Sequence, residues 1–265
     1  MADERRRYLI QQMELGGGEV ILEARAPAVG NAPSSPSGMD AAPISPAGEA
    51  EPKWKKGAPP IPGPGLLIEP PVPTLLGGDP LAELESLDAI AERIRTTRCC
   101  GLCEHRTHAV PGEGSARAKM VFVGEGPGAT EDATGRPFVG QAGKLLDDII
   151  EAIGLRRADV YITNVVKCRP PQNRKPLPDE IAACMPYLRR QLALLQPKVI
   201  VALGGTAGEA MLEVRKSLGD LRGKVHSYGG IPLVVTYHPA ALLRNPNWKK
   251  PTWDDVRIAR QLLDR

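Results

Sequence analysis

The sequence predicts an α/β protein of three layers, in which helices cover both faces of a central, mainly parallel sheet of four strands. Two observations lead to this fold class. Four short runs of apolar and β-branched residues are bounded by glycine, proline or polar residues, as buried strands are. The segments between these runs carry apolar residues at helical spacing. Such alternation of strand and helix favours parallel strands joined by crossover helices.

The composition divides the chain into two parts. Fourteen of the 27 prolines lie between Pro27 and Pro80, in a stretch otherwise rich in Ala, Gly and Ser. Such a stretch buries too little apolar surface to offset its chain entropy. We therefore expect residues 1–80 to form an N-terminal extension, with a short helix within residues 4–15 and then a disordered linker. Residues 81–265 are expected to form the folded domain, and the apolar content of 42% is ample for its core.

Charge and hydropathy exclude some functions. The formal net charge of +3 is too small to indicate nucleic-acid binding by itself. No run of about 18 apolar residues occurs, so we expect no membrane span. The first residues, MADERRRYLI, lack the apolar core of a secretion signal. We expect a cytoplasmic monomer, and a weak partner of the N-terminal extension stays open and unidentified.

The first expected element of the folded domain is a helix that starts at Leu81 and leads to Cys99. Leu and Ile recur at helical spacing in LAELESLDAIAERIRTT, and Asp79 and Pro80 suit the cap and first turn of this helix. The remaining elements alternate along the chain. Strands are expected at residues 120–123, 160–167, 197–205 and 231–239, and helices at residues 141–153, 179–195, 206–214 and 253–265.

A glycine-rich stretch follows the first strand and reads GEGPGATEDATGRPFVGQAG, from Gly124 to Gly143. Six of its twenty residues are glycine, which allows a backbone to approach a ligand closely and to present its N–H groups. The spacing matches neither of the two common nucleotide-binding glycine motifs. We expect this loop to form part of a binding site for another kind of ligand.

Polar residues mark the ends of three predicted strands. Glu125 and Gly126 follow the first strand, Asn164 lies in the second, and His238 lies at the end of the fourth. In parallel sheets the carboxyl ends of the strands meet at one edge, and ligands bind there. We therefore expect these residues to share one site.

The cysteines indicate a metal centre. Cys100 and Cys103 form a Cys-x2-Cys pair, and Cys168 and Cys184 lie further along the chain. Disulfides are rare in a reducing cytoplasm, so four such thiolates imply a metal. The wide second spacing suits a four-iron, four-sulfur cluster better than zinc, although spacing alone leaves both open. Cys99 is expected to be a spare thiol that can exchange places with Cys100.

Four segments together resemble the family-four uracil-DNA glycosylases, the iron-sulfur branch of the uracil-DNA glycosylase superfamily. They are the glycine-rich stretch, the cysteine-bearing segments CGLCEHRTHAVPGEG and KCRPPQNRKPLPDEIAAC, and the segment YHPAALLRNP. The resemblance covers the chain from about Arg98 onward. It implies a DNA repair enzyme that flips uracil out of DNA and hydrolyses its N-glycosidic bond, the first step of base excision repair. It also implies a 4Fe-4S cluster held by Cys100, Cys103, Cys168 and Cys184.

The resemblance implies roles for the residues at the predicted site. Phe138 would stack on the flipped uracil, the amide of Asn164 would read its edge, and His238 would stabilise the charge that builds on its 2-carbonyl. Glu131 is the acid expected to act in catalysis, near the 5-position of uracil. Gly124, Glu125 and Gly126 would line the uracil site.

Two further features follow from the same resemblance. The best-known uracil-DNA glycosylases carry an aspartate that orients the attacking water at the position of Gly126, and the resembled family lacks it. A single strong general base is therefore not evident. DNA contact is expected from the segment after His238, where Leu242 or Leu243 would enter the base stack and Arg244 would hold a phosphate. The substrate is expected to be uracil-containing DNA, single- or double-stranded.

Three other interpretations remain. A covalent uracil-trapping relative carries an inserted basic loop with a histidine, whereas here CRPPQNRKPLPDE follows Lys167 directly. An iron-sulfur DNA-binding module without turnover would not require Phe138, Asn164 and His238 together. A zinc-bearing α/β domain of unrelated function is the third, and iron content would distinguish it.

Overall fold

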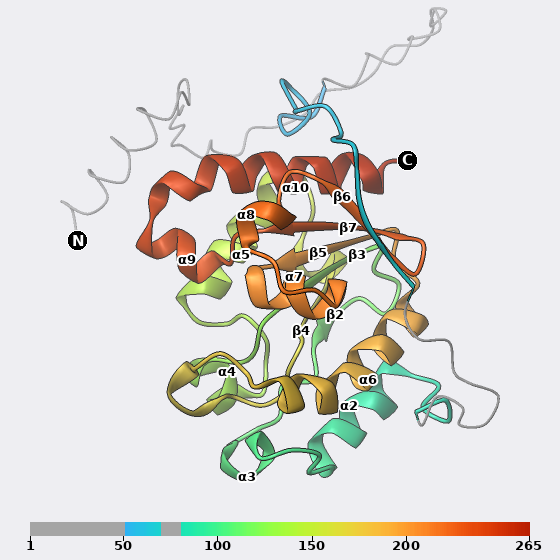
Figure 1. The fold of residues 1–265 in the computed structure, drawn as a ribbon, viewed down its shortest axis with the longest axis vertical. Helices are drawn as coiled ribbons and strands as arrows, with labels where there is room; N and C mark the ends of the chain where they lie inside the picture. The colour runs from blue at the N-terminus through green and yellow to red at the C-terminus, as the bar shows by residue number, and fades with distance from the viewer. Residues whose placement is uncertain (1–50, 70–80) are drawn as a thin grey trace, which may run out of the picture. The chain divides into compact units, whose positions relative to one another are not determined.

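The computed structural model describes residues 51–69 and 81–265, which belong to a compact unit that spans residues 49–265 (Figure 1). The helix expected within residues 4–15 lies outside the described residues. The proline-rich residues up to 50 and residues 70–80 lie outside them as well.

The described residues form one sheet of seven strands in the order β1-β6-β7-β5-β3-β4-β2. The strands are β1 (Pro64–Ile68), β2 (Glu113–Gly114), β3 (Met120–Gly124), β4 (Tyr161–Asn164), β5 (Val199–Leu203), β6 (Val225–Tyr228) and β7 (Ile231–Thr236). The four expected strands are β3, β4, β5 and β7, which are adjacent and parallel. The α/β class is confirmed, but the sheet is larger than the four strands expected.

The three additional strands lie toward the edges of the sheet, and their sequences lack the long apolar runs that predict buried strands. Strand β2 has two residues and pairs antiparallel with β4. Strand β6 pairs antiparallel with β7 and alternates half-buried and buried residues. Strand β1 pairs parallel with β6 although it lies in the proline-rich segment. Proline is tolerated at the first position of an edge strand, where its missing N–H is not needed.

Residues 51–69 are part of the fold, so the boundary expected at residue 81 is wrong for this segment. The side chain of Trp54 is buried. The guanidinium of Arg257 donates to the carbonyl oxygens of Trp54 at 2.7 Å and of Lys56 at 2.6 Å. Proline-rich composition predicted a linker, but these hydrogen bonds and the pairing of β1 satisfy the backbone of the segment.

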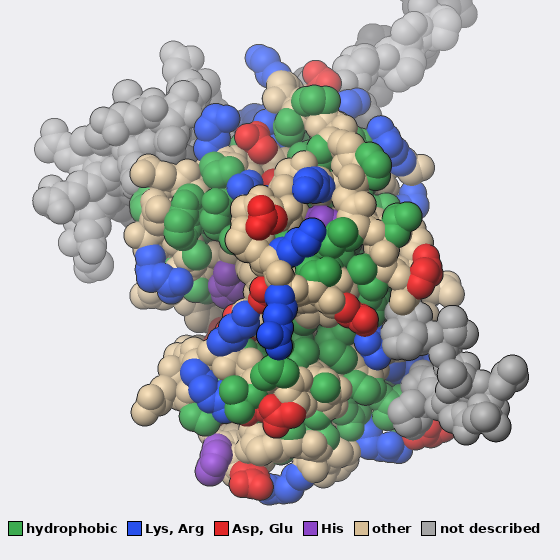
Figure 2. Space-filling view, viewed as in Figure 1, with side chains coloured by type: hydrophobic (Ala, Val, Ile, Leu, Met, Phe, Trp, Pro, Cys, Tyr) green, Lys and Arg blue, Asp and Glu red, His purple; other side chains and the backbone are tan. Residues whose placement is uncertain are grey.

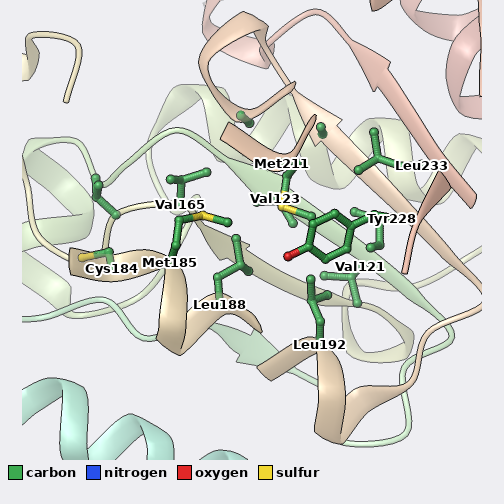
Figure 3. Packing of buried hydrophobic residues seen from close by; sticks show 14 of the residues in the cluster. Val121, Val123, Val165, Cys184, Met185, Leu188, Leu192, Met211, Tyr228 and Leu233 are labelled. Carbon is green, nitrogen blue, oxygen red and sulfur yellow. The ribbon is translucent and has the colours of Figure 1, made fainter. Parts of the chain in front are cut away.

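Helices cover both faces of the sheet. Successive residues of β3 point to opposite faces, so their contacts show which helices pack on each face. Met120 and Phe122 pack with α5 (Gln141–Ala152) and α10 (Lys249–Leu263) on one face. On the other face, residues of α6 (Pro178–Leu195) and α7 (Gly205–Leu212) pack with Val121 and Val123. Figure 3 shows Met185, Leu188 and Leu192 of α6 against these strand residues, with Cys184 at the end of the row.

The first helix of the domain starts later than expected. Residues 81–84 form only a turn, and α2 spans Leu87–Thr96 after the N-cap Ser86, whose Oγ accepts from the N–H of Ala89 at 3.1 Å. A serine cap of this kind satisfies a helix-terminal N–H and fixes the start of the helix. The remaining short helices are α3 (Leu102–His105), α4 (Ala129–Thr134), α8 (Leu218–Leu221), α9 (Pro239–Arg244), η1 (Arg157–Asp159), η2 (Pro171–Asn173) and η3 (Pro246–Trp248).

Within residues 51–69 and 81–265, the helices are all too short or too polar to traverse a lipid bilayer.

Candidate active site and cysteine cluster

A cavity of about 490 Å³ opens at the carboxyl ends of the parallel strands. It collects residues from the ends of β3, β4, β5 and β7, as expected for a sheet of this kind. The polar or aromatic residues that line it include Glu125, Glu131, Phe138, Asn164, Asn173, Arg174, Tyr237, His238, Arg244 and Trp248. All three strand-end positions singled out in the sequence therefore contribute to one cavity.

Gly124 allows two of these side chains to meet. It ends β3 directly opposite Asn164 in β4. A Cβ at this glycine would lie 2.4 Å from Oδ1 of Asn164 and 2.6 Å from the ring of Phe138. The strand end must therefore lack a side chain for the amide and the aromatic ring to occupy their positions.

The amide of Asn164 is prepared for a ligand. The residue is 1% exposed, and its Oδ1 is one of three buried side-chain polar atoms without a hydrogen-bond partner among the described residues. An unpaired buried acceptor costs about 1–3 kcal/mol, so such groups are rare unless a ligand satisfies them. The carbonyl of the same residue accepts from Nζ of Lys167 at 2.7 Å, which holds the end of β4 in place.

Glu131 organises the glycine-rich loop. One carboxylate oxygen accepts from the N–H groups of Val139 and Gly140, both at 2.9 Å, and the other accepts from the N–H of Gly128 at 3.1 Å. Glu131 is the third residue of α4, so this last contact is half of a capping box. Its carboxylate is committed to the backbone on both sides of the loop. These contacts favour a positioning role over the expected catalytic one.

The loop holds Phe138 in an unusual backbone conformation. Its φ angle of 49° lies in the left-handed region, which costs a residue with a side chain about 1 kcal/mol or more. Arg157 donates to the carbonyl oxygens of Phe138 at 3.1 Å and Pro137 at 2.6 Å. Together with Glu131, these hydrogen bonds fix the ring, which is buried and lies 5.4 Å from the ring of His238 between centroids.

His238 has a defined tautomer. It is the N-cap of α9, and its Nδ1 accepts from the N–H of Ala240 at 3.2 Å. The remaining ring proton is therefore on Nε2, which is free to donate. Burial of the ring, together with the charge of Arg244, lowers the pKa of His238 to about 4. At neutral pH the cavity thus contains a neutral imidazole with one available N–H donor.

The segment after His238 separates the two expected leucines. Leu242 is 1% exposed and packs in the interior, whereas Leu243 is 48% exposed. Leu242 is therefore not available to enter a base stack, and this expectation is corrected. Arg244 is exposed and lines the mouth of the cavity.

Two basic side chains that follow Cys168 in the chain are paired with acids. Arg174 forms an ion pair with Glu180 at 2.7 Å, and Lys175 forms one with Glu209 at the same distance. On the face of the molecule that Figure 2 draws, Lys and Arg side chains lie near the middle, and Asp and Glu side chains lie close to them. Such pairs contribute little net positive charge toward DNA.

The five cysteines converge at one place. The Sγ atoms of Cys99, Cys100 and Cys103 all lie within 4.8 Å of one another. Sγ of Cys103 also lies 3.6 Å from Sγ of Cys168. The thiol of Cys184 is within hydrogen-bonding reach of the thiols of Cys99 and Cys100. Hydrogen bonding from Cys184 lowers the pKa of Cys100 to about 6, whereas burial raises the pKa of Cys168 to about 12. The group is an all-thiol donor set that could hold a metal.

Two basic side chains border this cysteine cluster. Arg106 donates to Sγ of Cys168 at 3.2 Å and also to the carbonyl oxygens of Arg95 and Thr97 at the end of α2. Lys167 is 1% exposed, and its ammonium donates to Thr163, Asn164 and Gln191 at 2.7–2.8 Å. Lys167 thus lies between the cysteine cluster and the end of β4. Its role was not expected from the sequence, where a lysine before a cysteine carries no signal of burial.

The comparisons with known proteins agree with this geometry. Residues 111–259 match the family described as "Uracil DNA glycosylase superfamily". The "Type-4 uracil-DNA glycosylase" of Sulfurisphaera tokodaii is 49% identical over 68% of this chain and 86% of its own length. The proteins of the same name from Thermotoga maritima and Archaeoglobus fulgidus are 48% and 44% identical, over 68% and 69% of this chain and 96% of their own lengths.

This chain belongs to the type-4 uracil-DNA glycosylases. The resemblance identified from the sequence motifs is confirmed by these relatives. A solved structure, "The crystal structure of WT Pedobacter heparinus SMUG2", covers 54% of this chain and 74% of its own at 15% identity, with a TM-score of 0.36.

In this type-4 uracil-DNA glycosylase, the close packing of Val166 favours glycine at position 126. A Cβ there would lie 2.7 Å from Cγ2 of Val166, so a larger side chain needs a shift of this neighbour. Glu125, one residue earlier, lines the cavity and makes no side-chain hydrogen bond or ion pair within the described residues.

Proposed function

We propose that this protein removes uracil from DNA by hydrolysing the N-glycosidic bond of a nucleotide flipped into the 490 Å³ cavity. Family membership supports the activity. The observation that carries the assignment of the site is the buried amide of Asn164, whose Oδ1 lacks a partner within the described residues and lies beside an aromatic ring and a neutral imidazole.

Asn164 reads the edge of the base. Its Oδ1 accepts from the ring N–H of uracil, and its amide nitrogen donates to the 4-carbonyl. Cytosine presents an amino group and an unprotonated ring nitrogen at these positions, so both hydrogen bonds are lost. A site that leaves buried polar groups unpaired with the wrong base discriminates strongly.

Phe138 holds the face of the base. A flipped pyrimidine stacks on its ring, which Gly124 allows to approach the end of β3 and which the Glu131 and Arg157 hydrogen bonds fix from behind. A fixed ring loses little freedom when the base binds, so its stacking contributes more to affinity.

His238 stabilises the leaving group. As the bond between C1′ and N1 breaks, the electron pair moves onto the uracil ring and negative charge grows on the 2-carbonyl. The N–H of Nε2 donates to this oxygen, because Nδ1 of the neutral ring accepts from Ala240 and the ring proton is on Nε2. The sugar carbon becomes cationic and forms a bond to water. The proton that this water releases neutralises the departing uracil anion in the net reaction, so the products are free uracil and an abasic site.

Glu125 is the acid available to the attacking water. Glu131 is engaged by three backbone N–H groups, whereas Glu125 lines the cavity with a free carboxylate. We assign Glu125 the role of accepting from the water and Glu131 the role of positioning the loop. This assignment differs from the expectation from sequence, which placed Glu131 in catalysis.

The cysteine cluster fits a 4Fe-4S group. Cys103, Cys168 and Cys184 are buried, and Sγ of Cys100 lies within 4.8 Å of Sγ of Cys103. All four side chains offer thiol sulfur, the ligand atom that iron-sulfur clusters take. Cys100, Cys103, Cys168 and Cys184 would hold the group. When bound, it would supply a structural crosslink between the segment after α2, the segment after β4 and helix α6.

The DNA contact lies at the mouth of the cavity. Leu243, exposed on α9, fills the gap left in the base stack, and Arg244 holds a phosphate. The substrate is uracil-containing DNA, single- or double-stranded.

The test is a glycosylase assay on an oligonucleotide that carries one uracil, with the anaerobically purified protein and its Asn164→Ala and His238→Ala variants. We expect release of free uracil and an alkali-labile abasic site, with both variants at least 100-fold slower, on the order of other lost oxyanion-type donors. Glu151→Ala, exposed at the far end of α5, serves as the matched control and is expected to act as the wild type. No release, or an adduct with DNA that survives denaturation, would contradict the proposal.

A further inference from the structure

Three side chains form a stack beside the candidate active site. The rings of Tyr237 and Trp248 lie 4.8 Å apart between centroids and are nearly parallel, at 6°. The guanidinium carbon of Arg222 lies over the ring of Tyr237, 4.4 Å from its centroid. Two bulky groups this close to one ring must lie on opposite faces of it. Tyr237 therefore has both faces covered, and the order of the stack is Arg222, Tyr237, Trp248.

The inner end of this stack is anchored in the core. Arg222 donates to Oδ2 of Asp255 at 2.7 and 2.8 Å and to the carbonyl of Pro251 at 3.0 Å. Asp255 is 3% exposed and also accepts from the hydroxyl of Thr236, the last residue of β7. The charge of Arg222 is thus paired with a buried acid inside the molecule. The stack is thus built on the sheet.

Trp248, at the outer end of the stack, is the most exposed of the three tryptophans. Trp248 is 36% exposed, whereas Trp54 is buried under Arg260 and Trp253 is partly buried with Arg257 over its ring. The backbone at Trp248 is also fixed, because its N–H donates to Asn245 at 3.2 Å and its carbonyl accepts from Thr252 at 2.8 Å. An exposed indole held this firmly loses little conformational entropy when another flat group stacks on it.

The stack lies where DNA would enter. Tyr237 and Trp248 line the same cavity as His238 and Arg244, and the exposed Leu243 lies on the helix just before η3. The exposed residues Lys249 and Lys250 follow Trp248 directly, and Lys250 forms an exposed ion pair with Asp254 at 3.5 Å. An aromatic surface bordered by cations is the arrangement by which proteins hold single-stranded nucleic acid.

Building on the proposed function, we propose that the exposed face of Trp248 stacks on a nucleobase next to the flipped uridine. Leu243 would fill the gap in the stack while Trp248 holds the neighbouring base. Because every base has a flat face, this contact tolerates any neighbour, and it is available to single-stranded substrate. Trp248 therefore acts as a positioning residue and makes no contact with the reacting atoms.

The test measures binding and turnover separately. The probe is a single-stranded oligonucleotide that carries one 2′-fluoro-2′-deoxyuridine, whose electron-withdrawing fluorine opposes the cationic sugar and so slows cleavage. Binding is followed by the intrinsic tryptophan emission of the wild type. We expect this emission to fall on binding, and the decrease to be lost in Trp248→Phe, which keeps a ring but removes this fluorophore.

Affinity gives the second readout. We expect Trp248→Ala to raise the Kd and KM for the single-stranded substrate about tenfold, as expected for one lost base-aromatic stack, with kcat little changed. Trp248→Phe keeps a flat ring and should retain most of the affinity. Lys250→Ala, an exposed change two residues away, is the matched control for lost charge and should alter Kd less than Trp248→Ala at high salt.

Two results would overturn the proposal: emission of the wild type that does not change when the oligonucleotide binds, or a Kd and KM for Trp248→Ala equal to those of the wild type. The emission measurement uses the unmodified protein, so it decides the matter even where Trp248→Ala fails to fold. If the wild type releases uracil in either case, the proposed function stands and only the role of Trp248 is lost.

Discussion

Gly124 and Asn164 are paired across neighbouring parallel strands so closely that a single methyl group at Gly124 would lie 2.4 Å from the side-chain oxygen of Asn164. The same methyl group would also meet the ring of Phe138. The end of β3 thus sets the position of both groups that are proposed to hold uracil.

Gly124→Ala is therefore expected to impair catalysis more than folding. Displacement of a positioned group by about 1 Å can cost on the order of 100-fold in rate, so we expect kcat/KM on uracil-containing DNA to fall by about this factor. The control is Gly63→Ala, because a Cβ at Gly63 meets nothing within 4 Å. Steady-state kinetics with a thermal melt of each variant measure the two effects. Unchanged kinetics for Gly124→Ala would show that Asn164 and Phe138 move aside without consequence.

The pH profile should report the state of His238. Burial lowers its pKa from 6.5 to about 4, so the folded protein keeps the imidazole neutral well below the pH at which a free histidine gains its proton. We expect kcat/KM to stay on a plateau down to about pH 5 and to fall as the pH drops toward 4. The free energy of unfolding should also fall with decreasing pH. The unfolded chain, with a histidine pKa near 6.5, binds this proton at a higher pH than the folded protein does, so stability is lost as the pH falls from 6.5 toward 4. An acid limb near pH 6.5 that is absent from His238→Gln would contradict the assigned state.

Leu242 and Leu243 form a matched pair on one helix. Leu242→Ala removes a buried side chain and should lower the free energy of unfolding by about 2–4 kcal/mol. Leu243→Ala removes an exposed one and should change stability by less than ~0.5 kcal/mol. It should instead lower kcat/KM about tenfold, and more on duplex than on single-stranded substrate, because the duplex must be unstacked first. Denaturant unfolding and parallel assays on both substrates separate the two leucines, and equal effects of both variants on stability would be inconsistent with the observed burial.

The cysteine variants should separate ligands from the spare thiol. Cys103 is buried and lies near both Cys99 and Cys168, so we expect Cys103→Ser to lose most of its iron and its visible absorbance. Cys99 is exposed, and Cys99→Ser is expected to retain both. Iron and acid-labile sulfide per chain, measured on anaerobically purified protein, provide the comparison. Zinc in place of iron in the wild type would refute the cluster assignment.

The sequence was sufficient for the central strands and for the residues at their ends. Runs such as Met120–Gly124 and Val199–Leu203 are apolar throughout because both faces of these strands are covered, and this pattern is distinctive. Strand β1 was missed because proline-rich composition outweighed a short strand whose pairing partner, β6, lies about 160 residues away. Long-range pairing of this kind leaves no local pattern in the chain.

The side chains at the site were predicted by type but less well by role. Sequence could not separate Leu242 from Leu243, because which face of a six-residue helix is buried depends on what packs against it. Glu131 was expected in catalysis, although its place three residues after Gly128 at a helix start was a visible capping signal.

The edge of the sheet carries a consequence for how separate copies of this protein behave in solution. Strand β1 covers the outer side of β6. The carbonyl oxygen of Gly63, just before β1, accepts from the N–H of Val225, and the carbonyl oxygen of Ile68, at the end of β1, accepts from the N–H of Gly229. Without it, β6 would offer a row of unpaired backbone groups on which strands of other molecules can add. The covering strand is itself poorly suited to extension, since it begins with Pro64 and its register is irregular. We therefore expect a chain shortened to begin at residue 81, which lacks the five residues of β1, to aggregate more readily than the longer chain.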